Sequence, residues 1–344
     1  MKLQTIIERH WYAKLDPFLL IILFPFSIIY ELITTIRKFM FMLRIIPSTK
    51  ISVPVVIIGN ISVGGAGKTP LTKHIAEELT TNNIDVGIVL RGYKSKNKGV
   101  TIVTAQHKSD EVGDEALIYA QSGYKVAIGS NRVNAANMLL KKYPSIQIIL
   151  ADDGMQHYAL QRDMEICVVD SSRMFGNQQL LPVGPLREPM SRLNNVSAIV
   201  INGDYNKLKL TEILNKYKAP IYHQELQFKC FHNHVTNEKL TAGEMSKRHI
   251  YAMAAIGNPG RFYDYLEKLG QKIKGVKTFP DHYHYQERDT VSNLDIITTE
   301  KDYTKLAKFQ PKNVWVAEVS AKLSSDQLIN NIISLIEERN SHGQ

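Results

Sequence analysis

A glycine-rich stretch in the first third of the chain has the residue types and spacing of a phosphate-binding loop. In the general pattern G-x-x-x-x-G-K-[ST], backbone N–H groups cradle phosphates, the lysine reaches the β- and γ-phosphates, and the final hydroxyl helps to hold Mg²⁺. Gly67, Lys68 and Thr69 fit this pattern, whereas Ser62 takes the place of its first glycine. The residues expected to hold nucleotide phosphates are Ser62, Val63, Gly64, Gly65, Ala66, Gly67, Lys68 and Thr69.

The residues on either side favour such a loop over a glycine-rich turn without a ligand. The apolar run 53–58 predicts a strand before the loop, and Leu71, Ile75 and Leu79, each four residues apart, predict a helix after it. Bound phosphates would therefore lie at a helix N-terminus, where free N–H groups favour anions. Pro70 is compatible with this position, because the first helical turn has N–H groups without intrahelical partners.

Two adjacent carboxylates, Asp152 and Asp153, follow a predicted buried strand. Ligands bind at the carboxyl ends of parallel strands, and a carboxylate there is the usual second anchor for nucleotide-bound Mg²⁺. The alternative is a helix cap or a loop turn, which needs only one aspartate. The residues alone leave open which of the two faces the metal.

A second acidic pair, Asp114 and Glu115, lies in the segment Val-Gly-Asp-Glu-Ala. A kinase needs a carboxylate to orient and deprotonate the acceptor hydroxyl, and Asp114 is a candidate for that group. Asp114 would equally serve as the N-cap of the helix that follows, a common role for aspartate. Both interpretations stand on the residues alone.

Two further segments combine charge with stiff or unusual surroundings. His282 and His284 follow Asp281, and this pair is open to three interpretations: a zinc site that lacks a third ligand, surface histidines, or a partner for a catalytic carboxylate. Arg187 and Glu188 lie in a segment rich in proline and glycine, and rigid charged loops are often binding loops.

The elements that must position these residues alternate between apolar strands and amphipathic helices, a rhythm typical of an α/β fold with a parallel sheet. Helices are expected to begin near Thr69, Asp114 and Asn131, and a last one to run through 328–336. Predicted strands are 53–58, 86–90, 125–128, 146–150, 166–169 and 198–201, then 251–255, 296–298 and 314–316. We expect an N-terminal helical segment at 1–48, a P-loop core at 49–205 and a second, smaller α/β domain at 206–344.

The N-terminal segment is unusually apolar. Residues 17–30 contain no charge, and apolar residues continue at roughly helical spacing to Leu43. The uncharged run is short for a transmembrane helix, which needs about 20 residues. We therefore expect residues 12–46 to form one or two helices that lie on or dip into a membrane, with a helix packed on the catalytic core as the alternative.

Composition limits the class of partner. The chain has 344 residues, a formal net charge of +9 and an isoelectric point of about 9.2, which favour an anionic partner such as a nucleotide, a phosphorylated lipid or a membrane surface. No nucleic-acid motif is recognisable, so we expect no nucleic-acid partner. Two cysteines, Cys167 and Cys230, indicate a reduced cytosolic protein without a disulfide framework.

Taken together, these segments closely resemble the tetraacyldisaccharide 4′-kinase family over nearly the whole chain. The ordered motifs are GNISVGGAGKTP, LRGY, VGDEA, SNRVNAA, LADDGMQH, LLPVGPLREP, AIGNPGRF, FPDHYHY and TTEKD. The family loop typically has serine where the general pattern has its first glycine, which accounts for Ser62. One mild departure is Ala116, where the family usually has proline.

The resemblance implies a lipid kinase of lipid A and lipopolysaccharide biosynthesis. Such an enzyme uses ATP and Mg²⁺ to phosphorylate the 4′-hydroxyl of a tetraacylated glucosamine disaccharide 1-phosphate. It implies a location on the cytoplasmic face of the inner membrane, in contact with membrane lipids, with no obligate protein partner. The rival interpretation is a membrane-associated P-loop ATPase switch, whose signature lysine would replace Val63.

The resemblance also implies roles for individual residues. Asp114 would be the catalytic carboxylate, assisted by His282, while Lys68 neutralises the transferring phosphate. Thr69, Glu115 and Asp153 would hold the metal. Residues implied around the phosphates or the acceptor are Arg91, Arg132, Asp152, Gln156, His157, Arg187 and Glu188.

Overall fold

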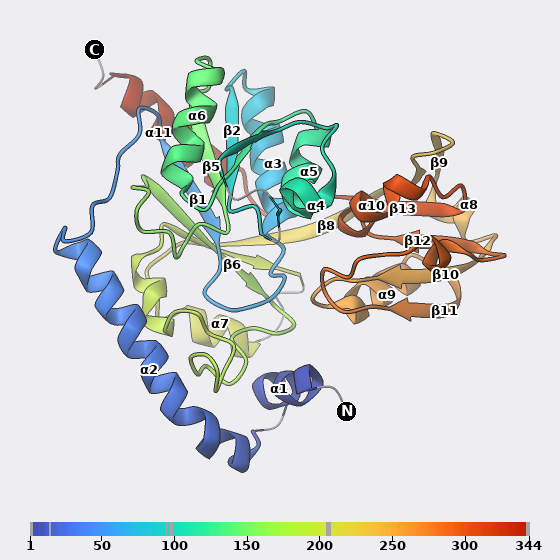
Figure 1. The fold of residues 1–344 in the computed structure, drawn as a ribbon, viewed down its shortest axis with the longest axis horizontal. Coiled ribbons are helices and arrows are strands. Elements are labelled where there is room, and N and C mark those ends of the chain that lie inside the picture. Colours follow the sequence, from blue (N-terminus) through green and yellow to red (C-terminus); the bar gives the residue numbers. More distant parts are fainter. Residues whose placement is uncertain (1–2, 14, 94, 97–98, 204–207, 342–344) are drawn as a thin grey trace.

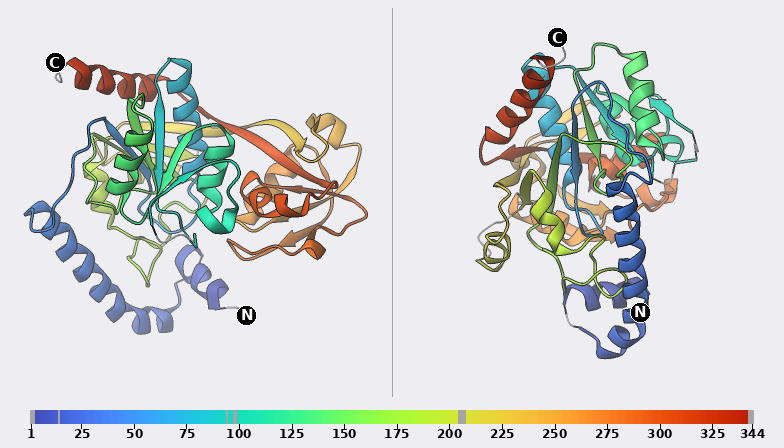
Figure 2. Two further views of the ribbon diagram at one scale, coloured as in Figure 1. Left: turned by 45° about the horizontal axis from the view of Figure 1, so that its top comes forward. Right: turned by 90° about the vertical axis from the view of Figure 1, so that its left-hand side faces the viewer.

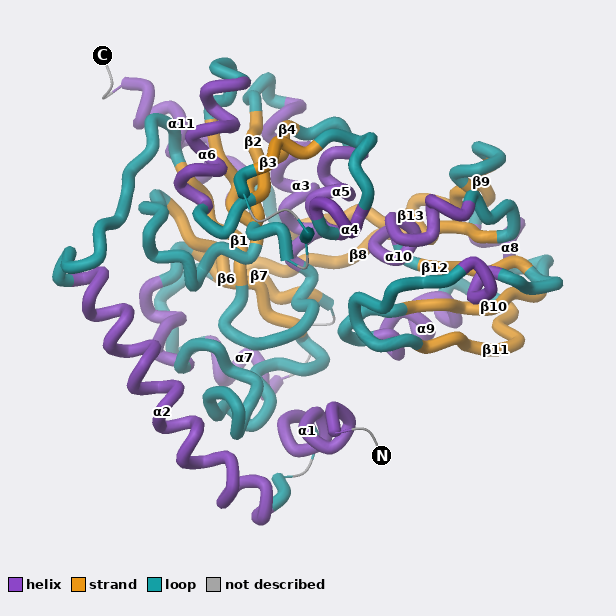
Figure 3. Tube along the Cα trace, viewed as in Figure 1, coloured by secondary structure: helices purple, strands orange, loops and turns teal. Residues whose placement is uncertain are grey.

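A computed structural model describes residues 3–13, 15–93, 95–96, 99–203 and 208–341. One continuous sheet runs through two lobes (Figures 1 and 3), in the strand order β11-β10-β12-β13-β8-β7-β6-β1-β5-β2-β4-β3, with β9 paired to β8. The strands are β1 (Val55–Gly59), β2 (Val86–Leu90), β3 (Thr101–Val103), β4 (Lys125–Ile128), β5 (Ile148–Asp152), β6 (Met164–Asp170), β7 (Ala198–Asn202), β8 (Ile221–Asn233), β9 (Glu238–Leu240), β10 (His249–Ala254), β11 (Lys272–Thr278), β12 (Asp295–Thr298) and β13 (Val314–Leu323).

Helices accompany the strands in both lobes. The α-helices are α1 (Leu3–Tyr12), α2 (Pro17–Met42), α3 (Lys68–Thr81), α4 (Ser109–Val112), α5 (Asp114–Gln121), α6 (Arg132–Lys142), α7 (Leu208–Leu214), α8 (Ala242–Met245), α9 (Pro259–Lys268), α10 (Glu300–Leu306) and α11 (Gln327–Ser341). Three short 3₁₀ helices are η1 (Met190–Asn195), η2 (Glu287–Thr290) and η3 (Ala307–Phe309). The expected α/β fold with a parallel P-loop core and an N-terminal apolar helix is confirmed.

The first lobe has a helical layer on each face of its parallel sheet, as the side-chain alternation of β1 requires. Val56 and Ile58 pack in one hydrophobic cluster with α3, α5 and α11. Val55 and Ile57 point to the other face and pack with α6 and α7. Because strand side chains alternate between faces, this fully buried strand needs apolar residues at every position, as its sequence predicted.

The C-terminal helix α11 returns to the first lobe, beside α3 (Figure 2). Its apolar residues Leu328, Ile329, Ile332 and Ile336 join the cluster that contains β1 and α3. Helix α11 therefore completes the core of the lobe that contains the P-loop.

The domain boundary predicted at residue 205 falls outside the described residues.

The second lobe is held to the first by two long strands. The start of β8 pairs in parallel with β7, and most of the rest of β8 pairs antiparallel with β13. The start of β13 pairs in parallel with β12 of the second lobe. Because β8 and β13 belong to both lobes, the backbone hydrogen bonds of one sheet fix the lobes relative to each other.

Two of the strands that the sequence pattern did not predict are β8 and β11. The burial of β8 alternates over much of its length, so polar residues such as Gln224 and Glu225 interrupt its apolar character. Strand β11 lies at the edge of the sheet and alternates between exposed and half-buried residues, several of them lysines. Neither strand has the continuous apolar run by which buried parallel strands are recognised.

The N-terminal helix α2 extends along the outside of the first lobe (Figures 1 and 2). It has 26 residues, its most apolar window has a mean hydropathy of 2.2, and only 6% of that window is buried. By length and composition α2 is able to cross a membrane, a test that core helices and signal sequences also pass. Its exposure argues against the alternative of a helix packed on the catalytic core.

Two side chains tie α2 to the loop that precedes η1. The buried Ser27 hydroxyl donates a hydrogen bond to the carbonyl oxygen of Leu180 over 3.1 Å. The Tyr30 hydroxyl donates to the carbonyl oxygen of Arg187 over 3.0 Å. The exposed apolar helix is therefore joined directly to the segment that carries Arg187.

Candidate active site

The glycine-rich loop forms the turn between β1 and α3. Its backbone is held by the segment around residue 185: the N–H of Val63 donates a 2.8 Å hydrogen bond to the carbonyl oxygen of Pro185, and Ser62 forms an isolated β-bridge with Leu186. Gly67 has φ of +88°, and a Cβ built on it would lie 2.0 Å from the Asn202 side chain. Only glycine therefore fits at the last position before α3, which begins at Lys68.

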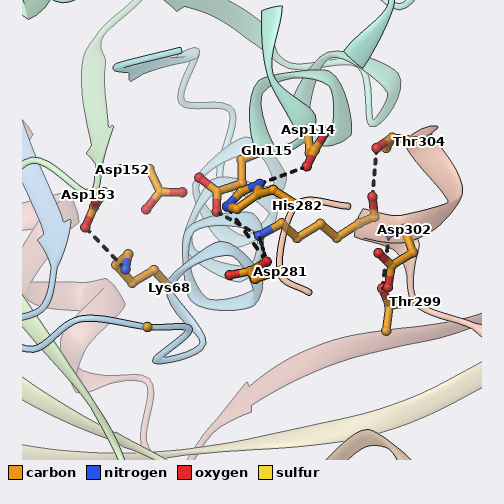
Figure 4. Close-up of polar contacts among 12 residues, drawn as sticks. Lys68, Asp114, Glu115, Asp152, Asp153, Asp281, His282, Thr299, Asp302 and Thr304 are labelled. Carbon is orange, nitrogen blue, oxygen red and sulfur yellow. Dashed lines mark hydrogen bonds and ion pairs between the residues drawn. The ribbon is translucent and has the colours of Figure 1, made fainter. Parts of the chain in front are cut away.

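Lys68 forms an ion pair with Asp153, which follows β5, the strand next to β1 (Figure 4). Its ammonium lies 3.2 Å from the Asp153 carboxylate and 3.3 Å from the side-chain oxygen of Asn60. Arg187 also contacts Asp153, at 3.1 Å. Burial opposes ionisation of Asp153, but the charges of Lys68 and Arg187 outweigh it and hold the pKa of this carboxyl far below its usual range.

The neighbouring Asp152 has the opposite electrostatic environment. It is the last residue of β5 and only 1% exposed. Burial and the negative charge of Glu115 raise the pKa of Asp152 to about 7, although Lys68 opposes them. The Tyr119 hydroxyl donates a 2.6 Å hydrogen bond to one of its oxygens, while the other, Oδ1, is buried without a partner.

Asp114 lies across the cleft from Lys68, at the first turn of α5. The N-cap of α5 is Gly113, so the alternative role of Asp114 as the helix cap is wrong. The carboxylate is 3.2 Å from His282 Nδ1 and 3.5 Å from the ammonium of Lys305. Burial opposes ionisation of Asp114, but the hydrogen bond from His282 and the charges of Lys305 and Lys301 lower its pKa.

His282 belongs to the second lobe, in the loop after β11. Its own φ is +61°, and its backbone N–H donates to Ala255 over 3.3 Å. Its ring contacts that of Tyr93 from the first lobe, with ring centroids 5.2 Å apart. The Asp114–His282 contact therefore joins the two lobes across the cleft.

Helix α10 contributes two lysines, four residues apart and thus on one helix face. Lys305 is 6% exposed and bridges Asp114 to Asp302, whose carboxylate lies 3.2 Å away. Lys301 lies 3.4 Å from Asp281 and 3.9 Å from Glu115. The sequence motif TTEKD included Lys301 and Asp302, but no local signal indicated Lys305, because its partner Asp114 is distant in the chain.

A set of the predicted residues supports the site from behind. Arg132 is buried, and its guanidinium donates to the carbonyl oxygen of Asp153 over 2.7 Å. The Nε2 atom of the His157 ring accepts a 3.3 Å hydrogen bond from the backbone N–H of Arg132. The Glu188 carboxylate accepts a 2.7 Å hydrogen bond from the side-chain amide of Gln156 and forms an ion pair with Arg192 at 3.1 Å. These contacts fix the segments that carry Asp153 and Arg187.

An open cleft of about 1650 Å³ collects most of the predicted residues in one place. Four predicted residues are not part of its wall: Ser62, Arg132, His157 and Glu188. The predicted residues that line it are Val63, Gly64, Gly65, Ala66, Gly67, Lys68, Thr69, Arg91, Asp114, Glu115, Asp152, Asp153, Gln156, Arg187 and His282.

The acidic residues of the cleft offer ligands for a hard cation. The orphaned Oδ1 of Asp152 and the ionised Asp153 are oxygen ligands of the kind that Mg²⁺ prefers. Mg²⁺ keeps several waters and binds substrate phosphates, so one or two protein carboxylates are enough. The zinc alternative for His282 and His284 finds no support, because in the described ranges the cluster of ligand atoms suited to such an ion lies elsewhere.

A strand, a glycine-rich loop and a helix that begins at Lys68, set in a parallel sheet, define a P-loop nucleotide-binding protein. The family model for tetraacyldisaccharide-1-P 4′-kinase (LpxK) matches residues 19–337. The chain belongs to this family.

Curated relatives and a solved structure agree over almost the full length. A tetraacyldisaccharide 4′-kinase of Methylobacillus flagellatus is 39% identical, over 96% of this chain and 97% of its own. The protein of the same name from Chromobacterium violaceum is 38% identical, over 94% and 96%. The "apo" form of LpxK from Aquifex aeolicus in complex with ATP is 30% identical and has a TM-score of 0.78, over 91% of this chain and 98% of that one.

The half-buried position of His157 predicts that the stability of the fold depends on pH. Burial and the positive charges of Arg132 and Arg162 lower the pKa of His157 to about 4, against about 6.5 in an unfolded chain. Between these values the unfolded chain binds a proton that the folded chain does not, so the free energy of unfolding falls as the pH falls from about 6.5 to about 4.

His157→Gln removes this titration, so the stability difference between wild type and variant should shrink as the pH is lowered through that window. Urea unfolding at steps from pH 7 to pH 4 measures it, with the exposed His249→Gln as the matched control. Parallel stability curves for wild type and His157→Gln would contradict the assignment.

Proposed function

We propose that this chain transfers the γ-phosphate of ATP to the 4′-hydroxyl of a tetraacylated glucosamine disaccharide 1-phosphate, giving the bisphosphorylated lipid A precursor. One observation carries the proposal beyond family membership. The Asp114–His282 pair and the P-loop Lys68 line one open cleft of about 1650 Å³ (Figure 4). In the reaction the acceptor oxygen forms a bond to the γ-phosphorus, the bond to the β-phosphate oxygen breaks, and ADP leaves.

The P-loop side binds and neutralises the phosphates. The backbone of 63–67 and the N-terminus of α3 receive the β- and γ-phosphates, and Lys68 turns from Asp153 to the transferring group. Thr69, Asp153 and Glu115 are the residues that would hold Mg²⁺, with the free oxygen of Asp152 beside them. Mg²⁺ supplies neutralisation of the charge that develops on the phosphates.

The opposite side activates the acceptor. Asp114 is held ionised, so it accepts the proton of the 4′-hydroxyl, and the hydrogen bond from His282 keeps the carboxylate aimed at the cleft. Lys305 fixes the same carboxylate from α10. Arg91, Gln156 and Arg187 lie along the cleft, where they contact the phosphates or the acceptor. Arg132, His157 and Glu188 act as positioning residues behind that wall.

The exposed face of α2 suits an enzyme whose acceptor is anchored in a bilayer. We propose that α2 holds the protein on the cytoplasmic face of the inner membrane, with the cleft at the boundary between lipid and water. The hydrogen bond from Tyr30 to the Arg187 segment ties this helix to the cleft wall. A membrane-associated ATPase switch is the alternative, and it would release phosphate without a lipid product.

Lipid product formation tests the proposed function. Purified protein with ATP, Mg²⁺ and a monophosphorylated acylated disaccharide should give a lipid heavier by one phosphate group in mass spectrometry. Lys68→Ala should reduce the rate by about 10²-fold or more, because it removes a preorganised charge at the transferring phosphoryl group. The exposed Lys50→Ala is the matched control. ATP hydrolysis without any phosphorylated lipid would favour the switch and refute the kinase.

The pairing of Asp114 and His282 has a kinetic consequence. Asp114→Asn and His282→Ala should each lower kcat by about 10²–10⁴-fold, the usual contribution of general base catalysis, while ATP binding is retained. Since the two residues act as a unit, the double variant should be little slower than the slower single variant. Steady-state kinetics on all four proteins decide it, and losses that multiply would mean that the residues act independently.

Acidic substitutions on the exposed face of α2 test its proposed membrane role. Ile21 and Ile28 are 73% and 52% exposed, so the double substitution Ile21→Glu, Ile28→Glu should leave the fold intact. It should release the protein from vesicles that contain anionic lipid and raise the KM for vesicular acceptor more than the KM for ATP. Val291→Glu, at a 72% exposed apolar residue outside α2, is the control. Unchanged sedimentation with vesicles would rule out this anchoring face.

A further inference from the structure

A second cluster of potential ligands lies in the second lobe, on β8 and β13. Cys230 and His232 are two residues apart on β8, so their side chains point to the same side of the sheet. Glu318 lies opposite Cys230 on β13. His234 follows in the turn after β8. None of these four side chains lines the catalytic cleft.

The ligand atoms of three of these residues converge. His232 Nδ1 is 2.7 Å and His234 Nε2 is 3.7 Å from the same oxygen of Glu318, and all three atoms lie within 4.8 Å of one another. Cys230 Sγ is 3.5 Å from the other oxygen of Glu318. Ligands about 2.0–2.1 Å from a tetrahedral zinc ion are roughly 3.3 Å apart, so small side-chain movements bring the three atoms to that geometry.

The surroundings orient both imidazoles toward this point. The second ring nitrogen of His232, Nε2, lies 3.2 Å from the side-chain oxygen of Asn237. Metal-binding histidines typically donate their other N–H to such an oxygen, which leaves the first nitrogen free to bind the ion. The ring of His234 is stacked on Tyr303 of α10, with centroids 4.7 Å apart.

From this geometry we propose that His232 Nδ1, His234 Nε2 and the Glu318 carboxylate bind one zinc ion, with the Cys230 thiol beside the fourth position. Two imidazoles and one carboxylate favour zinc over Mg²⁺ or Ca²⁺, which prefer oxygen ligands. The ion is structural: it ties the end of β8 to β13.

The site has a mechanical link to the kinase cleft. The ring on which His234 is stacked belongs to α10, and the same helix carries Lys301 and Lys305 against Glu115 and Asp114. Bound zinc would therefore stabilise the helix that positions the acceptor side of the active site. Its effect is on stability first, since no ligand of the cluster reaches the cleft.

Zinc binding by the full-length, metal-stripped protein tests the proposal, measured by competition with a chromogenic chelator in excess Mg²⁺ to occupy the carboxylates of the cleft. We expect the wild type to bind one Zn²⁺ per chain and to gain a higher melting temperature. His234→Ala and the nearly isosteric Glu318→Gln should bind at least about tenfold more weakly, by the loss of one ligand. The exposed His249→Ala should bind as the wild type does.

Circular dichroism of the metal-free proteins shows whether each variant folds, and Glu318→Gln decides the question should His234→Ala fail to fold. Absence of a stoichiometric zinc ion in the wild type overturns the proposal. Equal affinity in wild type and in both folded variants also overturns it, and would make the His232–Glu318 contact a simple ion pair.

Discussion

The hydrogen bond between His282 and Asp114 is the contact on which the arrangement of the active site depends. Asp114 begins a helix of the first lobe, and His282 lies in a loop of the second, 168 residues further along the chain. A separation of 3.2 Å is reached only when the lobes are held at one distance. The long strands β8 and β13 provide that constraint, because each pairs within both lobes. Helix α10 adds a second tie through Lys305.

The cleft contains two adjacent carboxylates, Asp152 and Asp153, whose pKa values are shifted in opposite directions. Asp153 is stabilised as an anion by Lys68 and Arg187, whereas burial beside Glu115 favours the protonated form of Asp152. In the proposed reaction a divalent cation and a phosphate chain would change both balances: Lys68 would contact the phosphates, and the cation would supply positive charge next to the carboxylates. On this proposal the ion pair between Lys68 and Asp153 is the arrangement without nucleotide, and the two groups would separate when nucleotide binds.

Local sequence predicted the parts of the site that local structure determines. The loop at 62–69, the strand before it and the amphipathic helix after it follow from spacing alone, and the pair Asp152–Asp153 follows from its place after an apolar run. The proposed catalytic role of Asp114 did not, since a carboxylate at a helix start has two common explanations, and within the sequence only the family resemblance favoured one of them; the structure then showed that Gly113 is the cap. Contacts between distant segments could not be predicted from local sequence, because they depend on tertiary structure. They are the hydrogen bond from Tyr119 to Asp152, the ion pair of Lys305 with Asp114, and the convergence of His232 and His234 on Glu318.

The most direct test of the account is a crystal structure of the protein with Mg²⁺, a non-hydrolysable ATP analogue and the monophosphorylated acylated disaccharide. The account predicts phosphates along 63–69 with the γ-phosphate bound by Lys68, and the acceptor hydroxyl within hydrogen-bonding distance of an Asp114 carboxylate that still contacts His282. An acceptor hydroxyl on a different side chain, or nucleotide phosphates away from the loop, would contradict it.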